Sequence, residues 1–307
     1  MGTEPYLDVH QHLWPAPFVE ALRRRSAPPM LRGWTLHTAG EPPYEVRPDD
    51  HDPVARAELD RAATRVLVSL SSPLGIESLP PAQAQPLLDA WHDGVRALSD
   101  PFTGWASLTR DEPDLDGLKQ LFADGLCGVQ VPATDLTTPA ELEALAPVLR
   151  RCEELNRPVL VHPGPVSTPS RTVGEFLPWW PAVVDYPAQL AAAWWSWIAV
   201  GRSLVPDLRI CFVAGAGLAP LQHERFTARA DGARLVVDPN TFVETSSYRR
   251  QGVDGLVRAL GIDVIVLGSD RPYAAAELDP HLGAAAIHAI AIDNPIRLLG
   301  KPQGERP

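Results

Sequence analysis

Short apolar runs recur along almost the whole chain, and each run is bounded by turn-forming residues. Eight of them predict strands, at residues 6–10, 65–70, 102–108, 128–131, 158–162, 208–213, 241–245 and 264–268. Several runs, such as VLV, ICFV and VIVL, are apolar throughout and do not alternate with polar residues. Continuous apolar strands are typical of parallel sheets, because such sheets are buried on both faces.

The segments between these runs carry apolar residues at helical spacing. They predict helices at residues 83–98, 115–123, 139–155, 188–200, 220–229 and 254–260. The sequence Thr138-Pro139-Ala140-Glu141 contains the residues of a capping box, with proline at the first helical position. Strands that alternate with helices eight times predict an α/β fold, a single-domain (β/α)8 TIM-like barrel over residues 1–307, in preference to an open doubly wound sheet.

Two connections are too long for a simple crossover helix, one over residues 13–64 and the other over residues 163–187. Both follow predicted strand ends, so both emerge on the face where such barrels keep their active sites. We expect these insertions to form lids or pocket walls. Arg32 and Trp34 in the first, and Trp179 in the second, are candidate substrate contacts, with ordinary packing as the alternative for each aromatic ring.

Ligand-type side chains follow three of the predicted strands. Residues two apart in a strand point the same way, so His10 and His12 project together at the end of the first strand. His162 ends the fifth strand and Asp270 follows the eighth. Singly, His162 could be a core histidine and Asp270 a helix cap, and a lone His-x-His arises by chance. Because all four come at strand ends on one face of a barrel, they predict a site for one divalent cation.

Composition narrows the possible partners. The 307 residues carry a formal net charge of −11, which disfavours nucleic acid and anionic membranes. No apolar run approaches the roughly 20 residues that span a bilayer, and the N-terminus lacks the basic and apolar regions of a signal peptide. The cysteines, widely spaced and odd in number, are expected to be buried thiols. We therefore expect a cytoplasmic protein that acts on a small molecule.

Four motifs in strand order carry a family resemblance: DVHQHLW, VHPG, GSDRP and the closing DNPIRLLG. The chain resembles the amidohydrolase superfamily, and within it the amidohydrolase-2 branch, which includes aminocarboxymuconate-semialdehyde decarboxylase and other nonoxidative decarboxylases. The resemblance implies one divalent metal, with zinc preferred and manganese as the alternative, held by His10, His12, His162 and Asp270. It also implies that Asp270 can accept a proton, and that the protein forms a homodimer.

One position departs from the pattern of this branch. The branch usually carries a histidine at the end of the sixth strand, where this chain has Ala214. A methyl group can neither transfer a proton nor polarise a water molecule. Three explanations stay open: His223 or Glu244 supplies the proton chemistry, the metal and Asp270 suffice, or catalysis has been lost and the barrel binds a ligand. Asp270, Glu244 and His223 are therefore the candidate catalytic residues.

These observations favour a metal-dependent hydrolase that acts on a small organic substrate through a metal-activated water. The alternatives are a nonoxidative decarboxylase of a small aromatic or unsaturated carboxylic acid, and a catalytically silent metal- or ligand-binding barrel. For an acidic substrate, Arg32 and Arg271 are candidates to hold the carboxylate by bidentate hydrogen bonds.

Overall fold

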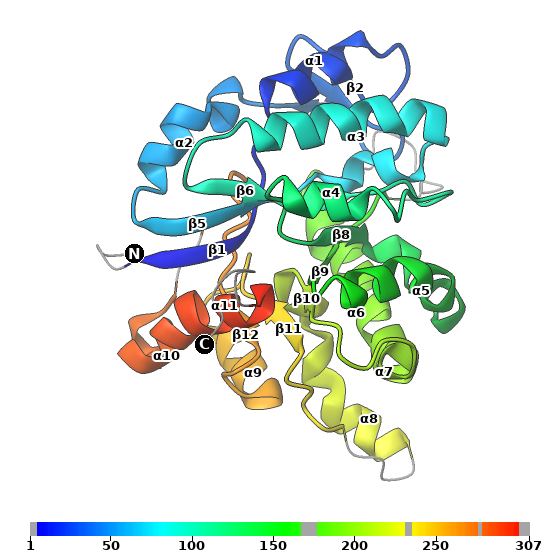
Figure 1. Cartoon of the computed structure of the whole chain (residues 1–307). Helices are drawn as coiled ribbons and strands as arrows, with labels where there is room; N and C mark the ends of the chain where they lie inside the picture. Colours follow the sequence, from blue (N-terminus) through cyan, green and yellow to red (C-terminus); the bar gives the residue numbers. More distant parts are fainter. Residues whose placement is uncertain (1–4, 167–176, 231–234, 276–277, 301–307) are drawn as a thin grey trace.

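The computed structural model describes residues 5–166, 177–230, 235–275 and 278–300. Its core is a ring of parallel strands, each paired with the next along the chain (Figure 1). The third strand position is split at Trp105 into two short strands. In chain order the strands are β1 (Tyr6–Gln11), β5 (Ala63–Val68), β6 (Phe102–Gly104) with β7 (Ala106–Ser107), β8 (Val129–Pro132), β9 (Val159–His162), β10 (Ile210–Phe212), β11 (Thr241–Glu244) and β12 (Ile265–Val266).

Backbone hydrogen bonds join the first and last strand positions. The Val9 amide donates to the Leu267 carbonyl over 3.0 Å, and the Asp270 amide donates to the His10 carbonyl over 2.9 Å. The segment that follows β12 therefore lies beside β1 and closes the ring. The predicted barrel is confirmed, and the alternative of an open doubly wound sheet is wrong.

Helices cover the outside of the ring (Figure 1). The predicted capping box begins the α5 helix: the Glu141 amide donates to the Thr138 hydroxyl over 3.3 Å, and the Glu141 carboxylate accepts from the Thr138 amide over 2.9 Å. The helix predicted at residues 220–229 begins three residues later, because a 3-10 turn precedes it. The barrel helices are α3 (Pro81–Arg96), α4 (Leu118–Ala123), α5 (Pro139–Glu154), α6 (Tyr186–Ser196), α7 (Arg202–Leu204), α8 (His223–Arg229), α9 (Arg250–Leu260), α10 (Ala284–His288) and α11 (Asn294–Leu299).

Shorter helical turns complete these connections. Single π-helical turns flank α6 at Pro181–Asp185 and Trp197–Gly201, and another links α10 to α11 at Ala289–Asp293. The 3-10 turns are Pro48–His51, Ser72–Leu74, Ile76–Ser78, Ala133–Asp135, Ala214–Gln222 and Pro280–Leu282. Among the described residues, no helix is long and apolar enough to cross a membrane.

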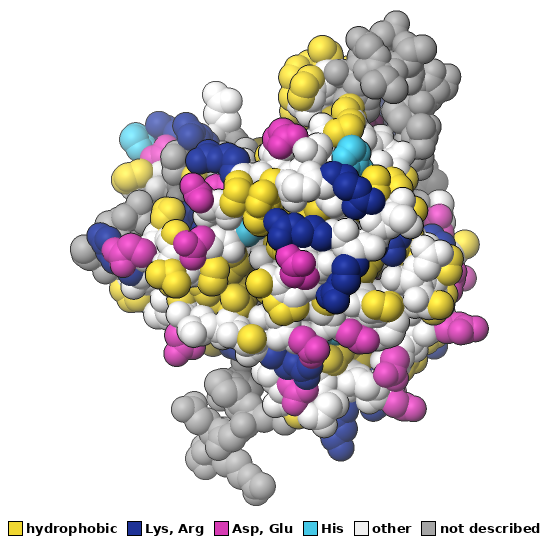
Figure 2. All heavy atoms as spheres, turned by 90° about the horizontal axis from the view of Figure 1, so that it is seen from above, with side chains coloured by type: hydrophobic (Ala, Val, Ile, Leu, Met, Phe, Trp, Pro, Cys, Tyr) yellow, Lys and Arg dark blue, Asp and Glu magenta, His cyan; other side chains and the backbone are white. Residues whose placement is uncertain are grey.

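Strand and helix side chains form one continuous core. Leu160 and Val161 of β9 are fully buried, as continuous apolar strands require. The three cysteines are buried free thiols, as predicted. On the face that Figure 2 shows, acidic and basic side chains are intermingled over the described residues.

The insertion after β1 has its own small structure. It contains α1 (Ala16–Arg24), an antiparallel sheet of β2 (Met30–Arg32), β3 (Thr35–His37) and β4 (Tyr44–Glu45), and α2 (Pro53–Leu59). Only residues 163–166 and 177–187 of the insertion after β9 are described. The two insertions touch: the Tyr186 hydroxyl donates to Glu41 over 2.5 Å, and a Cβ on Gly40 would lie 2.0 Å from the Val166 carbonyl oxygen.

Candidate metal centre

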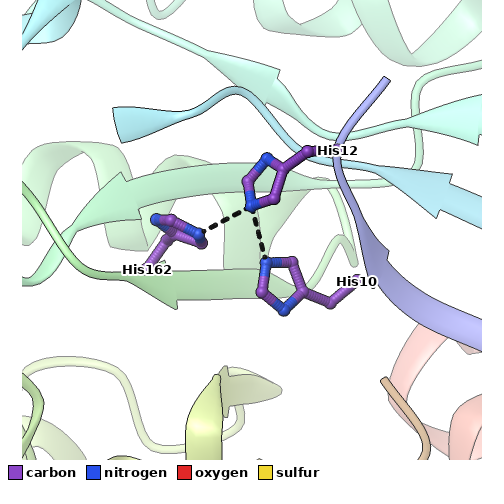
Figure 3. A group of neighbouring side chains, drawn as sticks. All are labelled: His10, His12 and His162. Atoms are coloured by element: carbon purple, nitrogen blue, oxygen red, sulfur yellow. Dashed lines mark hydrogen bonds between the residues drawn. The ribbon is translucent and has the colours of Figure 1, made fainter. Parts of the chain in front are cut away.

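Three histidine rings converge at the carboxyl ends of the first and fifth strand positions (Figure 3). His10 lies in β1, His12 follows it directly, and His162 ends β9. The Nε2 atom of His12 lies 3.2 Å from the Nε2 atom of His10 and 3.2 Å from that of His162. Each pair of ring centroids is 5.0 Å apart, and the rings are nearly perpendicular. The rings therefore meet tip to tip at one point.

Asp270 adds an oxygen to this cluster. Its Oδ1 atom lies 3.3 Å from the His12 Nε2 atom and 3.7 Å from the His10 Nε2 atom. The Asp270 backbone is left-handed, with φ of 56°, and its amide is held by the His10 carbonyl. The structure thus brings all four predicted ligand residues together. The histidines are almost fully buried, whereas the Asp270 side chain keeps 22% of its surface exposed.

The outer nitrogen of each ring faces an oxygen acceptor. The Nδ1 atom of His12 lies 2.9 Å from the Ser69 carbonyl oxygen, and the Nδ1 atom of His162 lies 2.9 Å from the Pro163 carbonyl oxygen. A carbonyl oxygen can only accept, so both Nδ1 atoms carry the proton and both Nε2 atoms keep a free lone pair. Oxygen atoms that accept the Nδ1 proton in this way fix the orientation of histidine ligands in metal sites.

Burial favours neutral rings in this cluster. It lowers the pKa of His12 and lowers the pKa of His162 well below its usual value. For His10, burial also opposes protonation, but the adjacent Glu244 carboxylate outweighs it and raises the pKa. Only a neutral imidazole can donate its lone pair to a cation, so His12 and His162 are prepared to do so at neutral pH.

The spacing of the ligand atoms fits a single ion. Two atoms that each lie about 2.1 Å from one ion are separated by about 3.0 Å at a right angle and about 3.4 Å at the tetrahedral angle. The observed 3.2–3.3 Å separations around His12 Nε2 lie within this interval, and the 3.7 Å between His10 Nε2 and Asp270 Oδ1 lies just above it. Three imidazole nitrogens and one carboxylate oxygen that face a common point are the donor set of a divalent-metal site. His10, His12 and His162 could therefore hold a metal ion.

Glu244 lies behind His10. Its side chain is fully buried, and its Oε1 atom is 3.6 Å from the His10 Nδ1 atom. The carboxylate accepts hydrogen bonds from the Ala214 amide at 2.6 Å, the Ser246 amide at 2.7 Å and the Ser246 hydroxyl at 2.9 Å. Ala214 itself has a left-handed backbone with φ of 45° and contributes no polar side chain. The chain thus places a buried carboxylate beside the strand-six position that lacks a histidine.

The other predicted residues make their contacts elsewhere. His223 packs against the rings of Trp194 and Trp195, with centroids 5.8 and 5.9 Å away. Trp34 is stacked on His51 with a centroid separation of 6.4 Å. Trp179 is half exposed and lies against Trp180. Among the described residues, none of these contacts joins His223, Trp34 or Trp179 to the histidine cluster.

The two predicted carboxylate-binding arginines already have partners. Arg32 donates to three main-chain carbonyls, those of Arg23, Arg25 and Leu31. Arg271 forms an ion pair with the fully buried Asp60, which also accepts from the Tyr6 hydroxyl over 2.9 Å. The Arg271 guanidinium is therefore directed toward the protein interior.

Sequence reasoning missed two residues beside the cluster. The Tyr273 ring lies 5.5 Å from the His12 ring and is half exposed. The sequence held one signal, since Tyr273 directly follows the GSDRP motif. In the structure its amide donates to the Asp270 carbonyl over 2.8 Å, in the turn that this motif begins. The fully buried Asp8 accepts from the His10 and Ser269 amides at 3.1 Å each, which links β1 to the segment that carries Asp270.

Comparisons with known proteins agree with the predicted resemblance. No family model matches the chain. A 2-amino-3-carboxymuconate-6-semialdehyde decarboxylase of Dictyostelium discoideum is 28% identical over 194 residues, which cover 58% of this chain and 53% of that relative. The match therefore spans about half the length of the relative. The predicted resemblance to aminocarboxymuconate-semialdehyde decarboxylase is confirmed over this part of the chain.

Solved structures show the same fold over most of the chain. The Metarhizium anisopliae IDCase in apo form has a TM-score of 0.78 and 18% identity, over 97% of this chain and 98% of that one. A 5-carboxyvanillate decarboxylase of Novosphingobium aromaticivorans, complexed with manganese and 4-hydroxy-3-methoxy-5-nitrobenzoic acid, has a TM-score of 0.64 and 17% identity, over 88% and 87%. At these identities the likeness establishes the barrel fold.

Proposed function

We propose that this protein is a metal-dependent carboxy-lyase that releases carbon dioxide from a small aromatic or unsaturated carboxylic acid without an oxidant. The observation that carries the proposal is the convergence of three histidine Nε2 atoms and one Asp270 oxygen on a common point. The relatives reported above favour decarboxylation over the hydrolysis that the motifs first suggested. Of the two reactions that the motifs suggested, hydrolysis and decarboxylation, we therefore propose decarboxylation.

His10, His12, His162 and Asp270 would hold the ion. A bound divalent cation would supply a positive charge that attracts the substrate oxygens and stabilises the negative charge that develops in the reaction. Zinc suits three nitrogens and one oxygen, and manganese, which is present in one solved relative, is the alternative. The buried histidines exclude water from one side of the site, which strengthens electrostatic interactions within it.

Decarboxylation breaks the bond between a substrate carbon and its carboxyl carbon. The electron pair stays on the substrate carbon, which then takes up a proton in place of the departing carbon dioxide. We propose that the Asp270 carboxylate first takes up a proton from the solvent or the substrate and then passes it to this carbon, because it is the partly exposed member of the cluster. The half-exposed Tyr273 ring beside His12 offers an apolar face for a planar substrate.

The test measures metal content and product together. Protein purified without chelators should contain one divalent ion per chain, and should release carbon dioxide from at least one acid in a panel of hydroxybenzoates and unsaturated dicarboxylates. Asp270→Asn, which keeps the side-chain shape, should abolish release. Cleavage of esters, lactones or amides without carbon dioxide release would favour the hydrolase alternative.

Ala214 supports a second candidate, a barrel that binds a metal and a ligand but does not turn over. Its signature would be full metal occupancy with measurable binding of the same acids and no product. The homodimer that the family implies stays a prediction, and light scattering on the purified protein would measure it.

A further inference from the structure

The three histidines of the cluster are held in two different ways. His12 and His162 direct their Nδ1 atoms at main-chain carbonyls. A main-chain carbonyl is present whichever amino acid occupies that position. The Nδ1 atom of His10 faces a side-chain carboxylate, Glu244, at 3.6 Å. Among the described residues, His10 is the one member of the three whose Nδ1 atom has no main-chain acceptor. The Glu244 carboxylate carries a negative charge, which makes an imidazole a more basic ligand.

Glu244 has little freedom to move. Its Oε2 atom accepts from the Ala214 amide and the Ser246 hydroxyl, and its Oε1 atom accepts from the Ser246 amide. The side chain has no exposed surface. With both oxygens held by donors from two strand ends, the carboxylate can face His10 in one orientation only.

A glycine makes room for this carboxylate. A Cβ on Gly268 would lie 2.2 Å from Glu244 Oε1, 2.3 Å from its Cγ and 2.5 Å from its Cδ. These separations are far below van der Waals contact, and the donors to Glu244 oppose any shift. The first residue of the GSD motif is therefore glycine because Glu244 occupies the space where a side chain would be.

We propose that Glu244 is a positioning residue for His10. Its carboxylate faces the Nδ1 atom of that ring at 3.6 Å, and this atom has no hydrogen-bond partner among the described residues. The nearby negative charge favours a proton on Nδ1, which keeps the Nε2 lone pair directed at His12 and Asp270. The same carboxylate is hydrogen-bonded to the strand-six turn at Ala214. This inference rests on the proposed metal site. It changes the predicted role of Glu244, because a fully buried carboxylate behind His10 does not reach a substrate.

The experiment compares Glu244→Gln and Gly268→Ala with the unmodified protein. Glutamine keeps the size of the side chain but removes its charge and turns one acceptor into a donor opposite the Ala214 amide. Alanine at position 268 displaces a Glu244 side chain that is otherwise unchanged.

Competition with a chromogenic chelator measures the zinc affinity of each variant. The affinity should fall by about 10- to 100-fold in both, the range observed when a residue that contacts a metal ligand is changed. Glu77→Gln, a buried glutamate elsewhere in the barrel, is the matched control and should bind zinc normally.

A second measurement needs no metal. Side-chain ¹⁵N NMR of metal-free protein reports which ring nitrogen carries the proton. The His10 signals should move away from the Nδ1–H pattern in Glu244→Gln, while those of His12 and His162 stay in place. If Glu244→Gln fails to fold, Ser246→Ala removes one donor to the carboxylate and should change both measurements in the same direction, by less.

The outcomes separate the two proposals. Unchanged zinc affinity and unchanged His10 signals in folded variants would overturn the positioning role, even if the metal site is real. Failure of the unmodified protein to bind any divalent metal would overturn the proposed function. In that case the metal-free NMR comparison still decides whether Glu244 sets the protonation of His10.

Discussion

Two buried glutamates of the barrel have opposite surroundings. Glu244 accepts hydrogen bonds from two main-chain amides and one hydroxyl and faces His10. Glu77, in the turn after β5, is equally buried but accepts from the Ser72 hydroxyl alone, and its Oε2 atom has no hydrogen-bond partner among the described residues. Burial raises the pKa of Glu77 to about 7.

The difference shows that burial alone does not define the role of a carboxylate. Donors compensate a buried negative charge, and without them the neutral acid is favoured. Glu77 belongs to a polar chain in which Gln130 of β8 donates to Ser72 over 2.6 Å and to the Leu70 carbonyl over 2.7 Å. That chain ties the turn after β5 to β8. The same turn carries the Ser69 carbonyl that faces His12, but the hydrogen-bond partner of the Glu77 side chain is Ser72 and not a metal ligand. We therefore expect changes at Glu77 to affect stability, and changes around Glu244 to affect metal binding.

The largest expected effect is at the centre of the cluster. His12→Ala removes the Nε2 atom that lies nearest to His10, His162 and Asp270. Loss of a direct ligand should exceed the roughly 100-fold loss of affinity that an outer-shell change causes. Elemental analysis should find less than one metal per chain after dialysis, with no activity. A fully loaded His12→Ala protein would contradict the site, and Glu77→Gln is again the control.

Glu77→Gln should change the pH dependence of stability. The neutral carboxyl is favoured in the folded protein, so the contribution of Glu77 to stability is complete below its unfolded pKa of 4.5 and is lost as the pH rises through about 7. The variant should match the parent at pH 4.5 and exceed it at pH 8 by at most about 3 kcal/mol. Urea unfolding at both pH values, with metal content held constant, measures this. A difference that does not change with pH would show that Glu77 is not neutral in the fold.

The barrel and the four-residue cluster could be predicted from the chain because both follow from local patterns. Apolar runs mark strands, and in a parallel barrel every strand ends on the same face. Residues at the ends of distant strands, such as His12, His162 and Asp270, must then lie close together. The distance along the chain does not matter once the number and direction of the strands are known.

Contacts that depend on the exact path of the backbone could not be predicted. From Ala214 to Leu218 every residue has a positive φ, including Ala216, a conformation that costs roughly 1–2 kcal/mol per non-glycine residue. The spacing of apolar residues does not reveal such a turn. The hydrogen bond from the Ala214 amide to Glu244 could therefore not be predicted. Arg271 likewise pairs with Asp60, a residue of the first insertion whose course the local sequence does not specify.

A third glutamate, Glu41, has one hydrogen-bond donor to its carboxylate among the described residues, as Glu77 does, whereas Glu244 has three. Burial raises its pKa, and the Tyr186 hydroxyl donates to it from the second insertion. Tyr186→Phe removes that donor and should cost about 1–3 kcal/mol locally. Hydrogen exchange should become faster around residues 38–45 while the barrel strands stay protected. Tyr44→Phe, which removes an exposed hydroxyl from the same insertion, is the control. Unchanged exchange in Tyr186→Phe would mean that the contact does not hold the insertions together.

The smallest effect is expected where a side chain duplicates a main-chain acceptor. The Ser71 hydroxyl lies 3.2 Å from the His12 Nδ1 atom, but the Ser69 carbonyl is nearer, at 2.9 Å. Ser71→Ala should therefore leave the protonation of His12 intact and change zinc affinity far less than the roughly 10- to 100-fold expected for loss of an outer-shell partner. The same chelator competition applies. A loss as large as that of Glu244→Gln would show that main-chain acceptors do not suffice to orient these histidines, and the contrast between His10 and His12 would disappear.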